Sequence, residues 1–206
     1  MRDLFIVGDG VHAKEMVEIV ERINQSTPTW NLLGYLTSKS AEIGAVRNGY
    51  SVVGLWETLQ EYPDAALIAD NEWPLSLPLP HERLVSLIDP SAFVSRTAQI
   101  GVGCVFYSNC FVGYNARIAD HVFCLAGCVI NHDDVIEDRV VFASGVTLAG
   151  LVHVEAGCYL GQSCTVRQLL RVGRGSVIGM GAVVIRDVPP DSVIVGNPGR
   201  LSLKRT

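Results

Sequence analysis

The sequence predicts a small α/β unit followed by a parallel β-solenoid with three faces. From Ile88 to Val184 an apolar residue returns at every sixth position without a slip. A period of six fits neither an α-helix nor a single strand, but it fits short strands joined by tight corners, with three strands to a turn. Before residue 88 this period is absent, and segments typical of strands alternate with segments typical of helices.

Residues 1–87 form the predicted α/β unit. Alternation of strands and helices is typical of a small parallel sheet. Three prolines between residues 73 and 80 exclude a helix interior, so we expect an irregular surface segment there. We expect strands over residues 3–7, 30–36 and 65–69, a helix over residues 12–24 with Met16, Ile19, Val20 and Ile23 on one face, and a short helix near residues 56–62.

Residues 88–206 form the predicted solenoid with its closing segment. In each hexad the repeat residue points inward, and so does the residue two positions before it, because side chains alternate along a strand. The six cysteines all fall on these inward positions, so we expect buried core residues and neither disulfides nor metal ligands. Pro189 and Pro190 are expected to stop the coil, and Gly196, Asn197 and Pro198 to form a closing turn.

The charge of the chain excludes some partners. The formal net charge is −5, and basic blocks are absent apart from Lys204 and Arg205, which argues against nucleic acid as a partner. No apolar run approaches the ~18 residues that a membrane span needs. The apolar stretch at the start is too short for a secretion signal, so we expect a cytoplasmic protein without a membrane partner.

The corner after Ile130 is the strongest candidate for catalysis. It reads Asn131, His132, Asp133, Asp134 in a coil that is otherwise apolar and small. A neutral imidazole beside a carboxylate is a competent general base near neutral pH. The alternative is a solvated turn, because Asn, Asp and His are common turn residues.

Asp134 occupies an inward position that other hexads fill with Ala, Cys, Val, Leu or Ser. An unpaired buried carboxylate costs several kcal/mol, so this side chain must be paired, protonated or bulged outward. We expect a local distortion that re-aims the corner.

The other histidines are expected to be surface residues, and no metal is expected. A solenoid of this kind can carry a three-histidine zinc site, which needs imidazoles that converge from adjacent coils. His121, His132 and His153 occupy three different hexad phases and should not converge. His81 lies in the proline-rich segment.

The loop Gly8-Asp9-Gly10 follows a predicted strand and precedes a predicted helix. Backbone N–H groups and the helix dipole hold phosphate at such a place. A dinucleotide fingerprint needs a third glycine, and position 13 is Ala, so NAD is not favoured. A nucleotide diphosphate site and a purely structural turn both remain open.

With these residues in view, the chain resembles the bacterial sugar O-/N-acyltransferases of the left-handed β-helix, or hexapeptide-repeat, family. It is most similar to the N-acetyltransferases of UDP-4-amino-4,6-dideoxy sugars, which act on the way to bacillosamine and similar surface sugars. The resemblance covers nearly the whole chain. It is carried by Gly-Asp-Gly-Val-His-Ala from Gly8, Gly-Tyr-Leu from Gly34, Val53-Gly54, Ile88-Asp89-Pro90-Ser91-Ala92, Asn131-His132-Asp133, Leu148-Ala149-Gly150, Gly179-Met180-Gly181-Ala182-Val183-Val184 and Val195-Gly196-Asn197-Pro198.

The resemblance implies a left-handed coil and a homotrimer with active sites between neighbouring prisms. It implies acetyl-CoA as co-substrate and a nucleotide sugar as acceptor. Position by position, it makes His132 the general base and Asp133 the carboxylate that raises its basicity, with the Gly150 N–H as an oxyanion donor. The resemblance further assigns Gly10, Val11, His12, Thr37, Ser38 and Gly54 to the nucleotide sugar, and Gly150, Gln162 and Met180 to acetyl-CoA.

Three departures from the family pattern bear on the substrate. Thr37 and Ser38 stand where the bacillosamine enzymes carry two aspartates, which weakens the contact to uracil. Val141 stands where many relatives have a second histidine. The segment at residues 73–80 replaces a helix of the usual N-terminal domain.

The expected reaction is attack of the free amine of a 4-amino sugar on the acetyl thioester, with His132 taking the proton. One alternative is O-acetylation of a free sugar such as sialic acid, with no diphosphate at the N-terminal loop. Another is a non-catalytic trimer that kept the coil alone. Coenzyme A brings phosphates to an acidic protein, and the candidate cations are Arg167, Arg186, Arg200 and Lys204.

Overall fold

A computed structural model describes residues 1–71 and 79–204 of the chain. The chain divides into two compact units, Met1–Pro90 and Ser91–Thr206. The division falls three residues beyond the boundary expected after residue 87. Most of the proline-rich segment, residues 72–78, lies outside the described residues.

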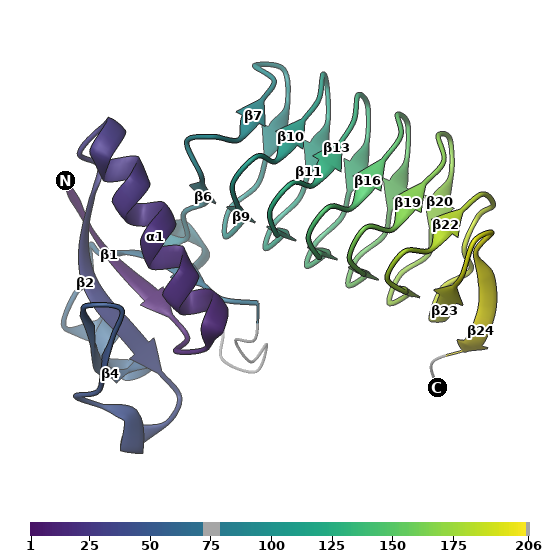
Figure 1. Cartoon of the computed structure of the whole chain (residues 1–206). Helices are drawn as coiled ribbons and strands as arrows, with labels where there is room; N and C mark the ends of the chain where they lie inside the picture. The colour runs from purple at the N-terminus through teal and green to yellow at the C-terminus, as the bar shows by residue number, and fades with distance from the viewer. Residues whose placement is uncertain (72–78, 205–206) are drawn as a thin grey trace. The chain divides into compact units, whose positions relative to one another are not determined.

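The first unit is a five-stranded sheet with one α-helix (Figure 1). The sheet has the order β3-β4-β2-β1-β5, with parallel pairs except for the antiparallel hairpin of β3 and β4. Helix α1 buries the side chains of Ala13, Met16, Val17, Ile19 and Val20. The elements are β1 (Arg2–Val7), α1 (Val11–Ser26), β2 (Trp30–Thr37), β3 (Val46–Arg47), β4 (Tyr50–Leu55), β5 (Ala66–Ala69), β6 (Leu87–Ile88) and three 3₁₀-helices, η1 (Ser40–Glu42), η2 (Trp56–Gln60) and η3 (His81–Arg83).

The strands and the helix expected in this unit are present, with two differences. The short helix near residues 56–62 is a 3₁₀-helix, η2. The β3–β4 hairpin was not anticipated, although Asn48 and Gly49 form its turn with φ of 46° and 82°. Asn-Gly is the dipeptide that best tolerates two successive left-handed residues, so this turn was readable from the sequence.

The second unit is a parallel β-solenoid built from two-residue strands. Each of these strands ends on the residue of the six-residue repeat, as the sequence predicts. The strands are β7 (Phe93–Val94), β8 (Gln99–Ile100), β9 (Val105–Phe106), β10 (Phe111–Val112), β11 (Arg117–Ile118), β12 (Phe123–Cys124), β13 (Val129–Ile130), β14 (Val135–Ile136), β15 (Val141–Phe142), β16 (Thr147–Leu148), β17 (His153–Val154), β18 (Tyr159–Leu160), β19 (Thr165–Val166), β20 (Arg171–Val172), β21 (Val177–Ile178) and β22 (Val183–Val184).

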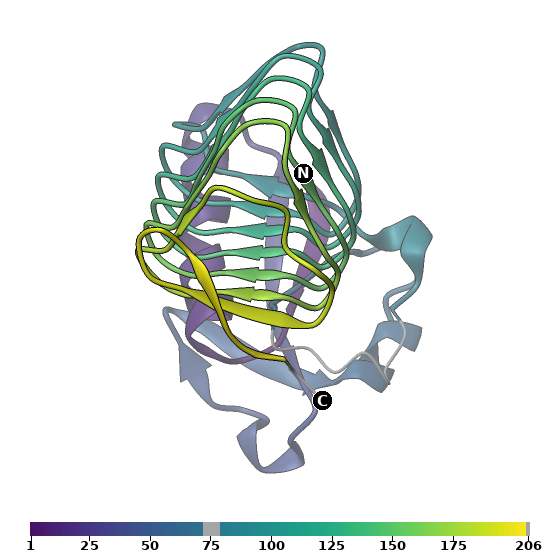
Figure 2. The same cartoon turned by 90° about the vertical axis from the view of Figure 1, so that its right-hand side faces the viewer.

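Three sheets form the faces of the solenoid, and the third also includes β23 (Ser192–Val195) and β24 (Arg200–Lys204). Their orders run β22-β19-β16-β13-β10-β7, then β20-β17-β14-β11-β8, then β24-β23-β21-β18-β15-β12-β9. Residues 18 apart are partners, as Arg117 and Val135 show, so one coil takes 18 residues. Figure 1 shows β7, β10, β13, β16, β19 and β22 side by side, and Figure 2 shows the coils one behind another.

The core of the solenoid is made of the inward residues of each hexad. All six cysteines are buried and free, as expected from their register. The thiols of Cys110 and Cys128 lie on successive coils without a disulfide, and they donate to the carbonyls of Leu125 and Ala143. The period of six therefore identifies the core residues directly.

Leu160 gives a test of this core. It is 0% exposed on β18, so Leu160→Ala should lower the free energy of unfolding by about 2–5 kcal/mol through lost burial and a residual cavity. Thr165→Ala, at an outward position of β19, should change it by less than about 0.5 kcal/mol. Urea unfolding of both variants measures the difference, and equal effects would contradict the assigned register.

The coil ends in an antiparallel pair, β23 (Ser192–Val195) and β24 (Arg200–Lys204). The expected closing turn with Gly196, Asn197 and Pro198 joins these two strands. Among the described residues, no helix combines the length and the apolar character that crossing a membrane requires. The left-handed sense of the coil stays a prediction.

Candidate active site

The corner between β13 and β14, residues 131–134, is called here the histidine corner. Asp133 adopts a left-handed conformation with φ of 59°, and its N–H donates to the Tyr114 carbonyl on the preceding coil, 2.8 Å away. The His132 carbonyl accepts the Leu151 N–H of the following coil at 3.0 Å. The backbone of the corner is therefore tied to the coils on both sides, while the His132 side chain is 54% exposed.

Asp133 orients the imidazole of His132. Its Oδ2 lies 3.0 Å from Nδ1 of His132, and its Oδ1 lies 3.4 Å from Nδ2 of Asn115. The hydrogen bond from His132 lowers the pKa of Asp133 below its usual value, so the carboxylate is ionised at neutral pH. An ionised carboxylate only accepts, so the neutral ring carries its proton on Nδ1 and has a lone pair on Nε2.

Gly150 makes room for that ring. It lies one coil after His132, and a methyl group in place of its hydrogen would come within 2.3 Å of Nε2 and 2.4 Å of Cε1 of His132. Any side chain here would collide with the imidazole. The Gly150 backbone thus forms the surface against which Nε2 rests.

Asp134 is completely buried and points inward, in register with the hexads. Its Oδ2 accepts the Asn131 N–H at 2.7 Å, and its Oδ1 accepts the Val152 N–H at 2.8 Å. Burial raises the pKa of Asp134 to about 7, and the hydrogen bonds from the two amides oppose this rise. Of the three possibilities that the sequence leaves open, the outward bulge is excluded and pairing with backbone amides is observed.

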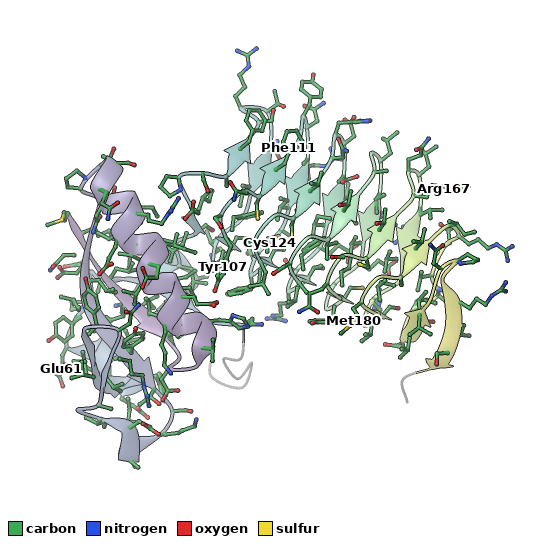
Figure 3. The ribbon with its side chains drawn as sticks, viewed as in Figure 1. Glu61, Tyr107, Phe111, Cys124, Arg167 and Met180 are labelled. Carbon is green, nitrogen blue, oxygen red and sulfur yellow. The ribbon has the colours of Figure 1, made fainter. Side chains whose placement is uncertain are left out.

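The residues expected at acetyl-CoA fall on two edges of the solenoid. Gln162 and Met180 lie on successive coils of one edge, where the Gly181 N–H donates to the Gln162 carbonyl at 2.8 Å. Met180 is 75% exposed. Gly150 shares the other edge with His132. Figure 3 shows this separation, with Met180 on one edge of the solenoid and Arg167 on another.

Of the cations expected to meet the phosphates of coenzyme A, Arg167 lies on the edge of the histidine corner. Arg167 follows Asn131 by two repeats of 18 residues, so it lies on the edge of the histidine corner. Arg167, Arg186 and Arg200 are all exposed. The side chain of Lys204 lies outside the described residues.

In the first unit, the residues expected at the nucleotide sugar lie at one edge of the sheet. Val7 pairs with Leu36, and Leu36 pairs with Gly54, so the carboxyl ends of three parallel strands meet there. Ligands bind at such edges in open α/β sheets. Gly10 is the N-cap of α1, Val11 and His12 begin this helix, Thr37 ends β2 with Ser38 next to it, and Gly54 lies in β4.

These six residues differ in accessibility. Val11 is 64% exposed, whereas Thr37 is 1% exposed and its Oγ1 accepts the Lys39 N–H at 3.1 Å. Gly54 is buried, and a methyl group there would lie 2.2 Å from Oγ1 of Thr58. His12 places Nδ1 3.2 Å from Oε2 of Glu15.

Arg47 is a residue at this edge that the sequence did not single out. It lies on the unanticipated hairpin, its guanidinium contacts Glu42, and its NH2 group is 3.6 Å from Oδ2 of Asp9. The Gly8–Gly10 loop therefore has a cation beside it. Only the hairpin brings Arg47 there, and the Asn-Gly turn was the one clue to it in the sequence.

The remaining histidines form no cluster. Nε2 of His153 lies within hydrogen-bond distance, 2.8 Å, of Oε1 of Glu137 on the outside of the coil. Within residues 1–71 and 79–204, no three His, Cys, Asp or Glu side chains are arranged to hold a metal ion.

Comparison with known proteins identifies the fold. No protein-family model matches the chain. The acetyltransferase domain of PglB from Neisseria gonorrhoeae superposes with a TM-score of 0.83 over 98% of this chain and 100% of that domain, at 25% identity. The chain has the hexapeptide-repeat acetyltransferase fold. The resemblance that the sequence predicts is thereby confirmed.

Two further similarities extend this result. A histidine-to-alanine variant of GDP-perosamine N-acetyltransferase from Caulobacter crescentus, in complex with CoA and GDP-perosamine, superposes with a TM-score of 0.87 over 99% of this chain and 98% of that one. At 22% identity it shows the fold alone.

The acyl-(acyl-carrier-protein)–UDP-N-acetylglucosamine O-acyltransferase of Synechocystis is 34% identical over 89 residues, 43% of this chain and 32% of that protein. The chain thus spans about a third of the length of the curated relatives it matches.

Proposed function

We propose that this protein transfers an acetyl group from acetyl-CoA to the amine of a nucleotide-linked 4-amino-4,6-dideoxy sugar. The observation that carries the proposal is the histidine corner. Asp133 holds Nδ1 of His132 at 3.0 Å, and the opposite ring nitrogen faces Gly150. This is the arrangement that a general base needs, because the lone pair is fixed in direction and solvent can still reach the ring.

The reaction needs a group that removes a proton from the amine, and we assign this role to His132. The amine nitrogen forms a bond to the acetyl carbon, and the bond from that carbon to the CoA sulfur breaks. Nε2 takes the proton that the amine loses and returns it to the departing thiolate, so the products are the amide and free CoA-SH. Asp133 stabilises the imidazolium between these two transfers, because it stays ionised. Gly150 would offer its N–H to the thioester oxygen.

The residues at the carboxyl edge of the first sheet favour an acceptor sugar that is linked to a nucleotide, because the nucleotide would bind there. The Gly8–Gly10 loop opens helix α1, where backbone N–H groups and the helix dipole favour phosphate. Arg47, whose guanidinium contacts Glu42 and lies 3.6 Å from Asp9, is the cation beside this loop that a phosphate would recruit. The neighbour from Caulobacter binds GDP-perosamine, which has the same chemical plan of a nucleotide joined to an amino sugar.

The nucleobase is the open part of the proposal. UDP is the first candidate because of the family resemblance, but Thr37 offers a buried hydroxyl that already accepts the Lys39 N–H. A hydroxyl contacts uracil more weakly than a carboxylate does. GDP- and dTDP-linked sugars therefore belong in the same test.

A homotrimer is part of the proposal, since the family places its active sites between neighbouring prisms. Phe93 and Phe111 stack on one face with ring centroids 5.0 Å apart and remain 57% and 37% exposed. Exposed aromatic pairs of this kind are typical of interfaces. Figure 3 shows Phe111 on the row of strands that begins with β7.

A substrate panel tests the proposal. Acetyl-CoA and longer acyl-CoAs are combined with UDP-, dTDP- and GDP-linked 4-amino sugars and with free sialic acid, and thiol release is followed. We expect release with acetyl-CoA and one nucleotide-linked amino sugar, and a raised melting temperature with the matching nucleotide alone. Light scattering on the same sample should give three copies.

Two outcomes would replace the proposal. Turnover of free sialic acid without any nucleotide effect would favour O-acetylation of a free sugar. Absence of acetyl-CoA binding in calorimetry would favour a non-catalytic assembly protein.

A further inference from the structure

The buried carboxylate of Asp134 joins two successive coils directly beneath the histidine corner. One oxygen accepts the N–H of Asn131, the residue before His132. The other accepts the N–H of Val152, two residues after Gly150. The same side chain therefore holds both of the corners that meet at the imidazole.

The regular ladder of the solenoid is interrupted at this place. One coil earlier, the Gly113 N–H donates to the Ile130 carbonyl, and one coil later, the Ala149 N–H donates to the Val166 carbonyl. By this pattern the Asn131 N–H would bond Leu148, but it bonds Asp134 instead. Strands β13 and β16 pair only at Val129 and Thr147, whereas the other adjacent two-residue strands of the described coils pair at both residues.

We propose that Asp134 is a positioning residue, which takes the Asn131 amide out of the ladder and thereby sets His132 against Gly150. This inference rests on the proposed function, since it assigns a role in the same site. Asp134 does not touch the substrate, because it is 0% exposed. The carboxylate suits this task because it accepts from two donors at once.

The protonation state of Asp134 gives a second readout. Burial raises its pKa to about 7, and the charged groups that act on it are His132, which lowers the pKa, and Asp133, which raises it. The same position on the adjacent coils holds Ala116 and Val152, which carry no charge. When Asp134 is protonated, one of its oxygens carries a hydrogen and no longer accepts well from the backbone N–H that faces it. The two hydrogen bonds to Asn131 and Val152 therefore weaken below about pH 7.

The sign of the stability effect follows from the same shift. The folded-state pKa of Asp134 lies above its ordinary value of 3.8, so folding takes up a proton between these two values. The contribution of Asp134 to stability therefore falls as the pH rises from about 4 to about 7. Removing the carboxylate should abolish this decline.

Asp134→Ala is the principal test, because Ala116 shows that the coil accommodates Ala at this position. We expect the variant to fold, with kcat lowered about tenfold to a hundredfold and KM changed less than about threefold. Below neutral pH, log kcat/KM should fall more steeply with falling pH in the wild type than in the variant, because only the wild type has a buried carboxylate at position 134 whose protonation weakens the two hydrogen bonds. The slope of this plot should therefore be lower in the variant.

Ser176→Ala is the matched control. Ser176 is also fully buried at the same hexad position, and its hydroxyl bonds Pro189 and Ser192, away from the histidine corner. We expect unchanged kcat and an unchanged slope in this variant. Asp134→Asn, of equal volume, provides a second variant and should also lose turnover, because its NH2 group would face one of the two amides.

The outcomes separate the inference from the proposed function. If Asp134→Ala and Asp134→Asn keep kcat within about twofold of the wild type while His132→Ala is inactive, Asp134 has no positioning role. The inference also fails if kcat and melting temperature fall together in both variants without any change of slope. If His132→Ala is fully active, the proposed function itself is wrong.

Discussion

His132→Ala should lower kcat at least about a hundredfold, because general-base catalysis contributes about 10²–10⁴ to such rates. The melting temperature should stay near that of the wild type. The imidazole is 54% exposed, and the hydrogen bonds that hold the corner come from the backbone of His132 and Asp133. Steady-state kinetics with acetyl-CoA and the amino sugar found in the panel measure the effect.

His153→Ala is the control for this experiment. His153 also lies on the coil and also contacts a carboxylate, Glu137 at 2.8 Å, but it faces outward on β17, and the residue one coil later is Arg171 instead of a glycine. We expect near-normal kcat in this variant. Near-normal turnover of His132→Ala would show that His132 is not the base.

Gly150→Ala should lower kcat by about tenfold to a hundredfold without unfolding the protein. The added methyl group would lie 2.3 Å from Nε2 of His132, so the imidazole must rotate away, and it can do so because it is half exposed. Small displacements of a reacting group cost about this much. Gly150 is not in the left-handed region, so its backbone accepts Ala, and the melting temperature should stay near that of the wild type once the ring has moved.

The double variant isolates the cause of this loss. If the methyl group acts through the imidazole, Gly150→Ala should cost nothing further in a protein that already carries His132→Ala. An additional large loss in the double variant would mean that Gly150 acts on the thioester by itself. Unchanged kcat in Gly150→Ala alone would contradict the observed packing of the ring.

Much of the fold could be predicted from the sequence, because each hexad of the solenoid requires an apolar residue at the same position. The repeat residues from Phe106 to Val184 end two-residue strands and are buried, and the cysteines fill the inward positions. Side chains that point inward and side chains that point outward alternate with a fixed period along a strand. The local sequence is therefore sufficient to assign the core residues of the solenoid. The first unit was less complete: β3 and β4 were not anticipated, because a short hairpin has too few residues to show a period.

The candidate site was predicted in part for the same reason. His132 and Asp133 are neighbours in sequence, so their hydrogen bond needs only a local turn. The environment of Asp134 needed coordinates, because its second partner, Val152, is 18 residues away. The sequence predicted a distortion that re-aims the corner, whereas in the structure Asp134 stays in register and the departure is limited to the missing pair between β13 and β16.

The sequence by itself therefore determined the coil, its core and the identity of the imidazole with its carboxylate, because each depends on a short-range repeat or on adjacent residues. The tertiary structure decided which corners meet. Stacking of coils puts Gly150 against His132, and the hairpin puts Arg47 beside Asp9. Such contacts depend on the exact register between coils and strands, where shifts of about an ångström change the chemistry, and a local signal such as the Asn48-Gly49 turn indicates a hairpin but not which side chains it brings together.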